Sequence, residues 1–436
     1  MRGFFIILHP EMISRISSLY LLSILIILYL PNFQAIDTKA SQNLYLSIVN
    51  SIFFLAILIK QKKIDLAIFK KPILICFGGF LIVASLSTLW ALNRIESLVR
   101  LTDLTIVFIT LFLALYLIKK YPIKTNVLLL FILGTLTLDI INSIVMYVQI
   151  ESVGDYGFLI ADELRGFWGN KNILAVAIAM RVPLILILFL RSNNRYLKLY
   201  ILFAIVSSFY IILLLSARSV FVSITITLLF IAFVLLVKKY AFSNFIKNDL
   251  RRSFLYIIPI ILSIILFRVL VNQDDGISIE NRASTIINSE EDRSITERLR
   301  FYSQSTNSIL SNPILGVGIG NWKIFSIKAD SETMMSYVVP YFAHNDFLEV
   351  FAETGILGFL FYFMFIFFLF KLCLSKIVLW MQNKSNFESV LLCLPFIFYF
   401  IDLNLNFPLD RTAMQVLLIV YISTIFLHNY ESESKE

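Results

Sequence analysis

Twelve apolar stretches, each close to the length of a membrane span, constrain the fold of this chain more than any other feature. A helix needs about 20 predominantly apolar residues to cross the hydrocarbon core of a bilayer. Such stretches lie near residues 16–31, 43–59, 73–90, 100–118, 126–149, 172–190, 197–215, 219–237, 254–271, 355–374, 388–402 and 412–428. With 59% hydrophobic and only 15% charged residues, the chain exceeds what a soluble core could bury. We therefore predict an all-α integral membrane protein with about twelve transmembrane helices, forming one polytopic domain over residues 1–436.

The basic residues indicate how these helices are oriented. Lysine and arginine gather in every second connection, within residues 60–71, 119–124, 191–198, 238–252 and 371–384. Short cytoplasmic connections carry such an excess, so the pattern predicts that both termini lie in the cytoplasm. Orientation accounts for much of the formal charge of +8, which disfavours a nucleic-acid partner. The first stretch lacks the small-residue cleavage site of a secretory signal, and we expect it to be retained.

Residues 272–342 form the longest connection, which is predicted to be a large extracytoplasmic loop. Ser294-Ile295-Thr296-Glu297 has the spacing of a capping box and Asn312-Pro313 supplies a stop, which together predict an amphipathic helix of about eighteen residues. One face of this helix is expected to be buried: Ile295, Leu299, Tyr302, Thr306, Ile309 and Leu310. Arg298 flanks that face, whereas Arg300 is expected to point nearly opposite, toward solvent.

Neither the glycines nor the cysteines indicate a cofactor. The alternating glycines of residues 316–320 are superficially similar to a dinucleotide-binding fingerprint, but no predicted strand precedes them. We instead expect a tight turn in which the backbone lies close to another element or to a substrate. The cysteines lie within or beside the apolar stretches at spacings that suit neither a metal site nor a disulfide framework: Cys76, Cys373 and Cys393.

Four outward segments bring a cation or a base to the predicted membrane surface. They are residues 165–172, the hairpin 216–219, the helix that carries Arg298, and the run that starts at His344. Arginine offers a planar fork of donors to phosphate oxygens, and its excess in outward loops runs against the usual charge distribution. His344 is the histidine that the predicted topology places outside, and imidazole has its ordinary pKa near working pH. This combination suits proton transfer beside a bound anion.

Each of these residues also has a purely structural interpretation. Arg218, in the short hairpin, could anchor lipid headgroups at the membrane edge. Arg165 shares its loop with four acids and could make a surface ion pair. His344 could be an ordinary residue at the start of a helix. Three carboxylates follow it on the opposite side of that helix and are expected to make helix or loop contacts rather than to orient the imidazole: Asp346, Glu349 and Glu353.

Charged residues also lie within the apolar stretches or at their ends. An unpaired charge there costs about 2.5–3.5 kcal/mol on insertion scales. We therefore expect Asp103, Asp139 and Arg181 to pair or to face a polar cavity, with a structural ion pair favoured over substrate binding for Arg181. Arg411 lies at the outward end of the last stretch and is a weaker candidate for the substrate pocket.

The second half of the chain resembles the O-antigen ligase and polymerase family of bacterial integral membrane proteins. Five segments carry the resemblance in order: residues 165–172, 216–219, 298–302, 312–321, and 344–345 with 353–355. One departure is Tyr302, where relatives often have tryptophan. The choice between Arg298 and Arg300 as the matching arginine therefore stays open.

The resemblance implies a GT-C-like, all-helical glycosyltransferase at the periplasmic face of the inner membrane, working without a cofactor or a metal. It implies a polyprenyl-diphosphate-linked glycan as donor and a glycan or a lipid A-core as acceptor. Arg218 and Arg298 would hold the diphosphate, with Arg165 as a looser basic contact, and His344 would assist the acceptor hydroxyl. Candidates for secondary contacts are Arg300, Arg411 and Asn345.

Two alternatives stay open beside this interpretation. A ligase and a repeat-unit polymerase of the same family differ in their acceptor, which the sequence does not reveal. A transporter or flippase of lipid-linked glycans is the alternative outside the enzymes, because twelve spans with both ends inside are common among transporters. The missing internal repeat and the few Gly or Pro residues within the stretches argue against it.

Overall fold

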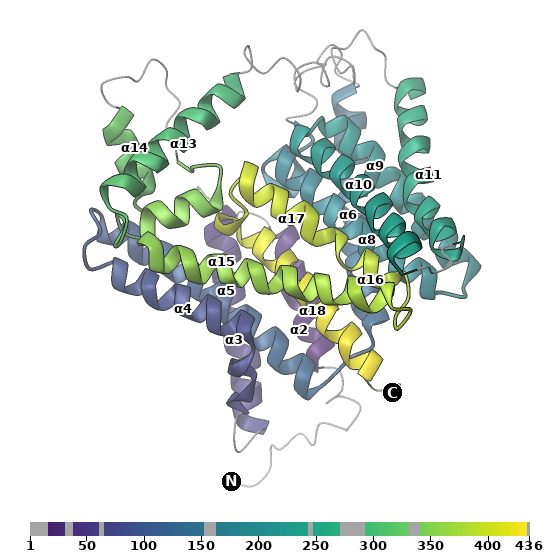
Figure 1. Ribbon diagram of the computed structural model, residues 1–436, viewed down its shortest axis with the longest axis horizontal. Helices are drawn as coiled ribbons and strands as arrows, with labels where there is room; N and C mark the ends of the chain where they lie inside the picture. The colour runs from purple at the N-terminus through teal and green to yellow at the C-terminus, as the bar shows by residue number, and fades with distance from the viewer. Residues whose placement is uncertain are drawn as a thin grey trace.

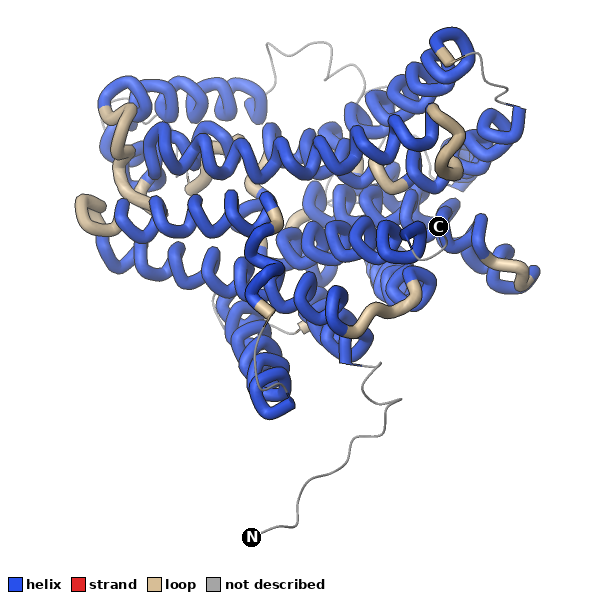
Figure 2. Tube along the Cα trace, turned by 60° about the horizontal axis from the view of Figure 1, so that its bottom comes forward, coloured by secondary structure: helices blue, strands red, loops and turns tan. Residues whose placement is uncertain are grey.

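The computed structural model describes residues 16–30, 38–60, 65–151, 163–242, 247–270, 293–330 and 341–433. These residues form helices joined by turns, with no strand among them (Figure 2). Within them, ten helices are long and apolar enough to cross a membrane: α3 (Thr38–Lys60), α5 (Arg94–Lys120), α6 (Thr125–Glu151), α8 (Lys171–Arg191), α9 (Arg195–Leu215), α10 (Arg218–Ala241), α11 (Lys247–Leu270), α15 (Asp346–Met381), α16 (Glu388–Leu391) continued by α17 (Leu394–Leu405), and α18 (Thr412–Glu433). The prediction of an all-helical, multi-pass membrane protein is confirmed.

Two shorter apolar helices coincide with the remaining predicted stretches. They are α2 (Ile16–Ile26), continued by η1 (Ile27–Tyr29), and α4 (Pro72–Ser87). The number of twelve spans therefore stays a prediction. Within the long connection the structure has α13 (Arg293–Ser311) and α14 (Trp322–Asp330), while residues 272–292 and 331–340 lie outside the described residues. The short helices η2 (Leu66–Lys70), η3 (Gly166–Trp168) and η6 (Pro408–Asp410) complete the elements.

The helix α15 organises the side of the molecule that carries His344. It crosses the whole structure, with α13 and α14 beside its first turns and α16 near its far end (Figure 1). The helix α4 packs along α15, and α8 contacts α6, α9 and α17. The apolar windows of α8 and α18 are 89% and 94% buried inside the protein, so these two helices form the centre of the bundle.

A sharp bend in α15 at Gly355 separates its first turns from the rest. Gly355 has φ 65° and ψ −169°, a conformation that a side chain would strain. A Cβ there would also lie 2.1 Å from the carbonyl oxygen of Ile314, and a Cβ on Gly316 would lie 2.4 Å from the carbonyl of Glu353. The glycine-rich turn therefore packs backbone to backbone against the bend. The expectation of a close backbone approach in this turn is confirmed.

The buried face of α13 differs from the one we predicted from its apolar residues. Leu299 and Leu310 are 62% and 74% exposed, and Thr306 is exposed as well. The side chains that are buried instead are Phe301, Gln304, Ser305 and Ser308. Phe301 turns inward because it packs edge-on against Trp322, the first residue of α14. This rotation places Arg298, one turn before Phe301, on the inner side of the helix.

The three charged residues that we singled out within the spans, Asp103, Asp139 and Arg181, are paired, as expected. Arg181 forms a buried ion pair with Asp139, whose carboxylate also accepts a hydrogen bond of 3.1 Å from the Trp168 indole. Asp103 pairs with Lys39 at 2.7 Å between nitrogen and oxygen. These pairs remove the cost of isolated charges, so Arg181 has a structural role. All three cysteines are buried thiols: Cys76, Cys373 and Cys393.

Candidate functional site

His344 lies in the turn that directly precedes α15 and has a left-handed backbone. Its φ of 55° is uncommon for a residue with a side chain and persists only where the surroundings enforce it. The next residue, Asn345, caps the helix, because its side-chain oxygen accepts a hydrogen bond of 3.1 Å from the N–H of Leu348. The Tyr302 hydroxyl, from α13, donates to the carbonyl of His344 at 3.2 Å. These two hydrogen bonds hold the backbone of the turn that carries the imidazole.

Two phenylalanines enclose the imidazole. The ring of Phe301 stacks on it with centroids 6.0 Å apart, and the ring of Phe407 meets it edge-on at 5.0 Å. The Nδ1 atom of His344 is buried and has no hydrogen-bond partner among the described residues. A buried polar nitrogen without a partner costs free energy, which indicates that this atom is kept for another group.

Two guanidinium groups act on the imidazole from different elements. Arg298 approaches from α13 and Arg411 from the residue after η6. Burial lowers the pKa of His344 to about 4, the charges of Arg298 and Arg411 act in the same direction, and the backbone of Leu405 opposes them. His344 is therefore neutral near pH 7. The Nε atoms of both arginines are buried and lack hydrogen-bond partners among the residues that the structure describes.

Asp402 belongs to the same region and escaped the sequence interpretation. Its carboxylate is 1% exposed, and one oxygen accepts a hydrogen bond of 2.6 Å from Asn406. The other oxygen has no hydrogen-bond partner in the described parts of the chain, and Arg298 interacts with it electrostatically. An acid inside an apolar stretch was the available signal, since such residues are rare unless they serve a site.

Arg411 and Arg300 lie in surroundings that differ from those expected from the sequence. The guanidinium of Arg411 lies over the Phe407 ring at 4.8 Å, directly beside His344, although we ranked it a weaker candidate. Arg300 is not solvated as predicted: it is half-buried, lies 2.5 Å from Glu297 and covers the outer side of Phe301. Arg298 is therefore the arginine of α13 that faces His344.

Arg218 and Arg165 lie at the same end of the bundle as His344. Arg191, the last residue of α8, pairs with Glu388, the first residue of α16. Since α16 follows the far end of α15, this ion pair marks the end of the bundle opposite His344. The helix α8 therefore begins, and α9 ends, at the His344 end, which places Arg165 and Arg218 there. Arg218 opens α10, which packs along α17, and α17 ends near the His344 turn. Arg165 is exposed and precedes η3, which contacts α6 and α8 rather than α13.

The chemistry of this region follows from its donors. Two guanidinium Nε–H groups that have no acceptor among the described residues, beside a neutral imidazole, suit an anion with several oxygens and a group that must lose a proton. Among the described residues, no group of three or more His, Cys, Asp or Glu side chains is arranged to hold a metal ion.

Residues 203–363 match a family model described as O-antigen ligase. The matched segment runs from α9 into α15 and includes Arg218, Arg298 and His344, while Arg165 and Arg411 lie outside it. No curated protein sequence matches the chain.

Proposed function

Because residues 203–363 form an O-antigen ligase family domain, we propose that this membrane protein transfers a saccharide from a polyprenyl diphosphate carrier to a hydroxyl of an acceptor sugar. The family accounts for the coarser part, a membrane glycan transferase of the ligase or polymerase type that uses lipid-linked glycans. The finer part, the reaction and the residues that carry it, rests on the surroundings of His344.

The observation that carries the proposal is the pair of guanidinium groups, Arg298 and Arg411, beside the neutral imidazole of His344. Breaking the bond between the sugar and the diphosphate builds negative charge on the leaving group. Fixed guanidinium groups stabilise that charge more in the transition state than in the ground state, which lowers the barrier. Arg218, at the start of α10, supplies a third cation for the same leaving group.

His344 acts as the general base in this scheme. The acceptor oxygen forms a bond to the anomeric carbon of the donor sugar while the bond from that carbon to the diphosphate breaks. The proton of the acceptor hydroxyl moves to the imidazole, at Nδ1, the ring nitrogen that has no hydrogen-bond partner in the described parts of the chain. The electron pair leaves with the carrier diphosphate, so charge and atoms balance.

An apolar cavity beside His344 offers a place for the polyprenyl chain of the donor. It measures about 660 Å³ and is lined by side chains of α10, α15 and α17. Phe347 and Phe400 stand at its His344 end, with ring centroids 6.4 Å apart. A carrier chain in this cavity would bring its diphosphate to the end of α10 that carries Arg218.

The same proposal assigns the His344 end of the bundle to the periplasmic face of the bacterial inner membrane, with both termini in the cytoplasm. Its support is the distribution of basic residues, which gather at the opposite end. Lys119, Arg191 and Lys238 lie there, each paired with an acid. Such residues favour the cytoplasmic side of a membrane.

The test compares two histidines in a transfer assay with carrier-linked donor. His344→Ala should reduce product by at least about a hundredfold, the size of a general-base contribution. His428→Ala is the matched control, because His428 lies at the opposite end, 3.6 Å from Glu388, and its loss should leave transfer intact. EDTA should leave the rate unchanged. Wild-type product from His344→Ala would overturn the assignment.

The acceptor distinguishes a ligase from a polymerase of this family. A deletion strain that accumulates single repeats on the carrier would identify a polymerase. A strain that accumulates long chains not attached to lipid A-core would identify a ligase.

A further inference from the structure

A polar cavity lies next to the His344 site, between α3, α5, α14 and the first turns of α15. It measures about 400 Å³, within the range of about 300–1,000 Å³ that is typical of small-molecule sites. We call it the charged cavity, after the side chains that line it: Lys39, Arg100, Asp103, Glu349, Glu353 and Asp410.

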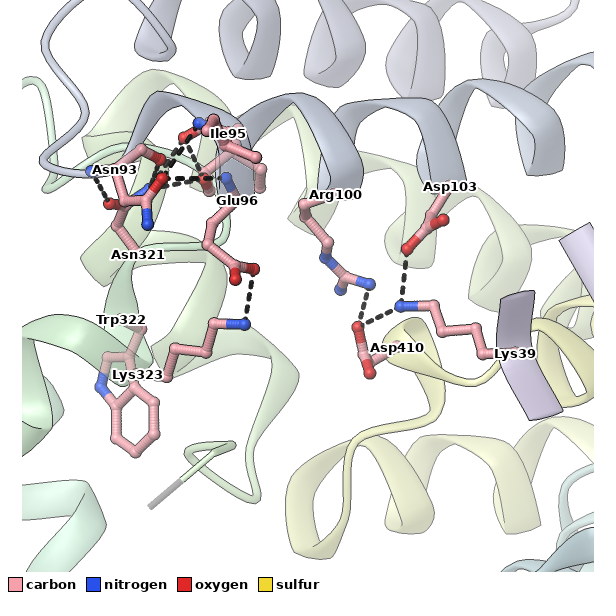
Figure 3. Close-up of polar contacts among 12 residues, drawn as sticks. Lys39, Asn93, Ile95, Glu96, Arg100, Asp103, Asn321, Trp322, Lys323 and Asp410 are labelled. Carbon is pink, nitrogen blue, oxygen red and sulfur yellow. Dashed lines mark hydrogen bonds and ion pairs between the residues drawn. The ribbon is translucent and has the colours of Figure 1, made fainter. Parts of the chain in front are cut away.

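The cations of the charged cavity are matched by acids. Lys39 bridges Asp103 and Asp410, at 2.7 and 2.8 Å, and Arg100 pairs with Asp410. Figure 3 shows these four side chains, from α3, α5 and the turn at η6, pointing toward one another. Arg100 and Lys39 outweigh the effect of burial and hold the pKa of Asp410 below its usual range, so the network stays charged at neutral pH.

A second pair lies at the rim, where Lys323 of α14 contacts Glu96 of α5 at 2.6 Å (Figure 3). Its carboxylate and ammonium are 38% and 31% exposed, so the pair stands where the cavity meets solvent. With this pair, each cation that lines the cavity has a carboxylate partner.

Two carboxylates remain outside these pairs. Glu349 and Glu353 lie one turn apart on α15, are 9% and 4% exposed, and make no ion pair with any described residue. Glu349 accepts a hydrogen bond of 2.8 Å from the N–H of Ala343, and Glu353 accepts one of 3.0 Å from the N–H of Trp322. A carboxylate has about four acceptor positions, so both retain acceptor capacity in the cavity that they line.

A pair of aromatic rings links the charged cavity to His344. Phe342 lines the cavity and stacks on Phe407, with ring centroids 4.1 Å apart. Phe407 in turn meets the imidazole of His344 edge-on. Ala343, which donates to Glu349, is the residue directly before His344. A molecule in the charged cavity would therefore lie beside the group that we assign to proton transfer.

The charges decide what the cavity can take. The cavity is lined by five carboxyl groups and three cations, and each of these cations already has a carboxylate partner, which disfavours a second diphosphate as occupant. Hydrogen-bond acceptors in a buried cavity suit a molecule with many hydroxyl groups. Tyr341, which is 60% exposed at the edge of the cavity, offers a ring to the apolar face of a sugar. We propose that the charged cavity binds the saccharide of the acceptor, a neutral or amino-bearing glycan, through the carboxyl groups of Glu349 and Glu353. This inference rests on the proposed function.

The first experiment measures binding to the full-length protein in detergent. The probes are the repeat-unit oligosaccharide released from the surface polysaccharide of the source strain, and inorganic pyrophosphate. Glu349→Gln and Glu353→Gln should each weaken oligosaccharide binding about tenfold or more, because each replaces a carboxyl oxygen that faces the cavity. Pyrophosphate binding should stay unchanged in both. Glu388→Gln, the same change at the opposite end of the bundle, should leave both probes bound as in the wild type.

Tyr341→Ala provides a second variant, because an exposed ring is not needed for folding. It should also weaken oligosaccharide binding without affecting pyrophosphate. In transfer assays with a soluble acceptor oligosaccharide, all three variants should raise the KM for the acceptor and leave the KM for the carrier-linked donor unchanged. A rise confined to the donor, weaker pyrophosphate binding, or wild-type oligosaccharide binding in folded variants would overturn the inference.

The two proposals fail in different ways. His344→Ala should bind the oligosaccharide as the wild type does, even though it makes no product. If His344→Ala remains active, the proposed function is wrong. If it is inactive while the Glu349 and Glu353 variants bind normally, only the acceptor site is wrong.

Discussion

The imidazole of His344 lies nearly parallel to the ring of Phe301, with an angle of 15° between the planes. Phe301 is buried and also meets Trp322, so α13, α14 and the turn before α15 share one small aromatic cluster. The contact between Phe301 and His344 covers one face of the imidazole. It also joins α13, the helix that carries Arg298, to His344.

We predict that Phe301→Ala raises the pKa of His344 from about 4 toward its ordinary value, because water reaches the ring. Losing a buried ring should also lower stability by about 3 kcal/mol. Histidine NMR titration and thermal unfolding in detergent measure the two effects. Phe203→Ala, which removes a ring that is 62% exposed on α9, should change neither. An unchanged titration in Phe301→Ala would show that the ring does not shield His344.

The depressed pKa of His344 predicts how stability depends on pH. Between about pH 4 and 6.5 the unfolded chain binds a proton on this residue that the folded protein does not. Stability should therefore rise as pH increases through that window and level off above it. Unfolding temperatures of the wild type and of His344→Asn, measured across the window, test this. Parallel pH curves for the two proteins would contradict the assignment.

Arg298 and Arg300 form a matched pair on α13. Arg298→Lys should reduce transfer at least about tenfold, since lysine cannot offer the planar, two-pronged contact to a diphosphate. Arg300→Lys should retain nearly full activity, because Arg300 contacts Glu297 and the outer side of Phe301. Initial rates at saturating donor compare them. The reverse order of activities would assign the diphosphate to Arg300.

The bend in α15 offers a test of how the site is held. Gly355→Ala forces a side chain into a left-handed backbone and against the carbonyl of Ile314, which should cost at least about 2 kcal/mol and abolish transfer. Gly134→Ala is the control, because a Cβ there meets no atom within 4 Å in the middle of α6. Thermal stability and activity of both variants are the readouts. A fully active Gly355→Ala would mean that the bend does not position the site.

The positions of most helices could be predicted, because a helix that crosses a bilayer needs an apolar run of a characteristic length. The inner face of α13 could not. In a chain that meets lipid or a membrane surface, an apolar residue such as Leu299 need not turn inward. In the structure the inward-facing ring is that of Phe301, which packs against Trp322. Local periodicity contains no information about such a contact between residues far apart in sequence.

Some residues of the candidate site could be singled out from the sequence, and others could not. His344 and Arg298 stood out because a histidine and an arginine are unusual on the predicted outer side. Phe407 carries no chemical signal in the sequence, and Asp402, although an unusual acid in an apolar stretch, is linked to Arg298 only by the fold. The charged cavity joins segments more than three hundred residues apart, as in the pair of Lys39 and Asp410, which no local pattern reveals.

The surroundings that keep His344 neutral also imply an order of events. In the empty protein, burial and the field of Arg298 and Arg411 together make the imidazole a weak base, with a pKa of about 4. A bound diphosphate would cancel that field and strengthen the base at the moment when the leaving group is in position. A sugar that arrived first would meet an idle imidazole, and water that entered alone would find no partner ready to deprotonate it. Under the proposed function, His344 would thus become an effective base only when the donor is bound, and the carrier-linked glycan would be protected from hydrolysis.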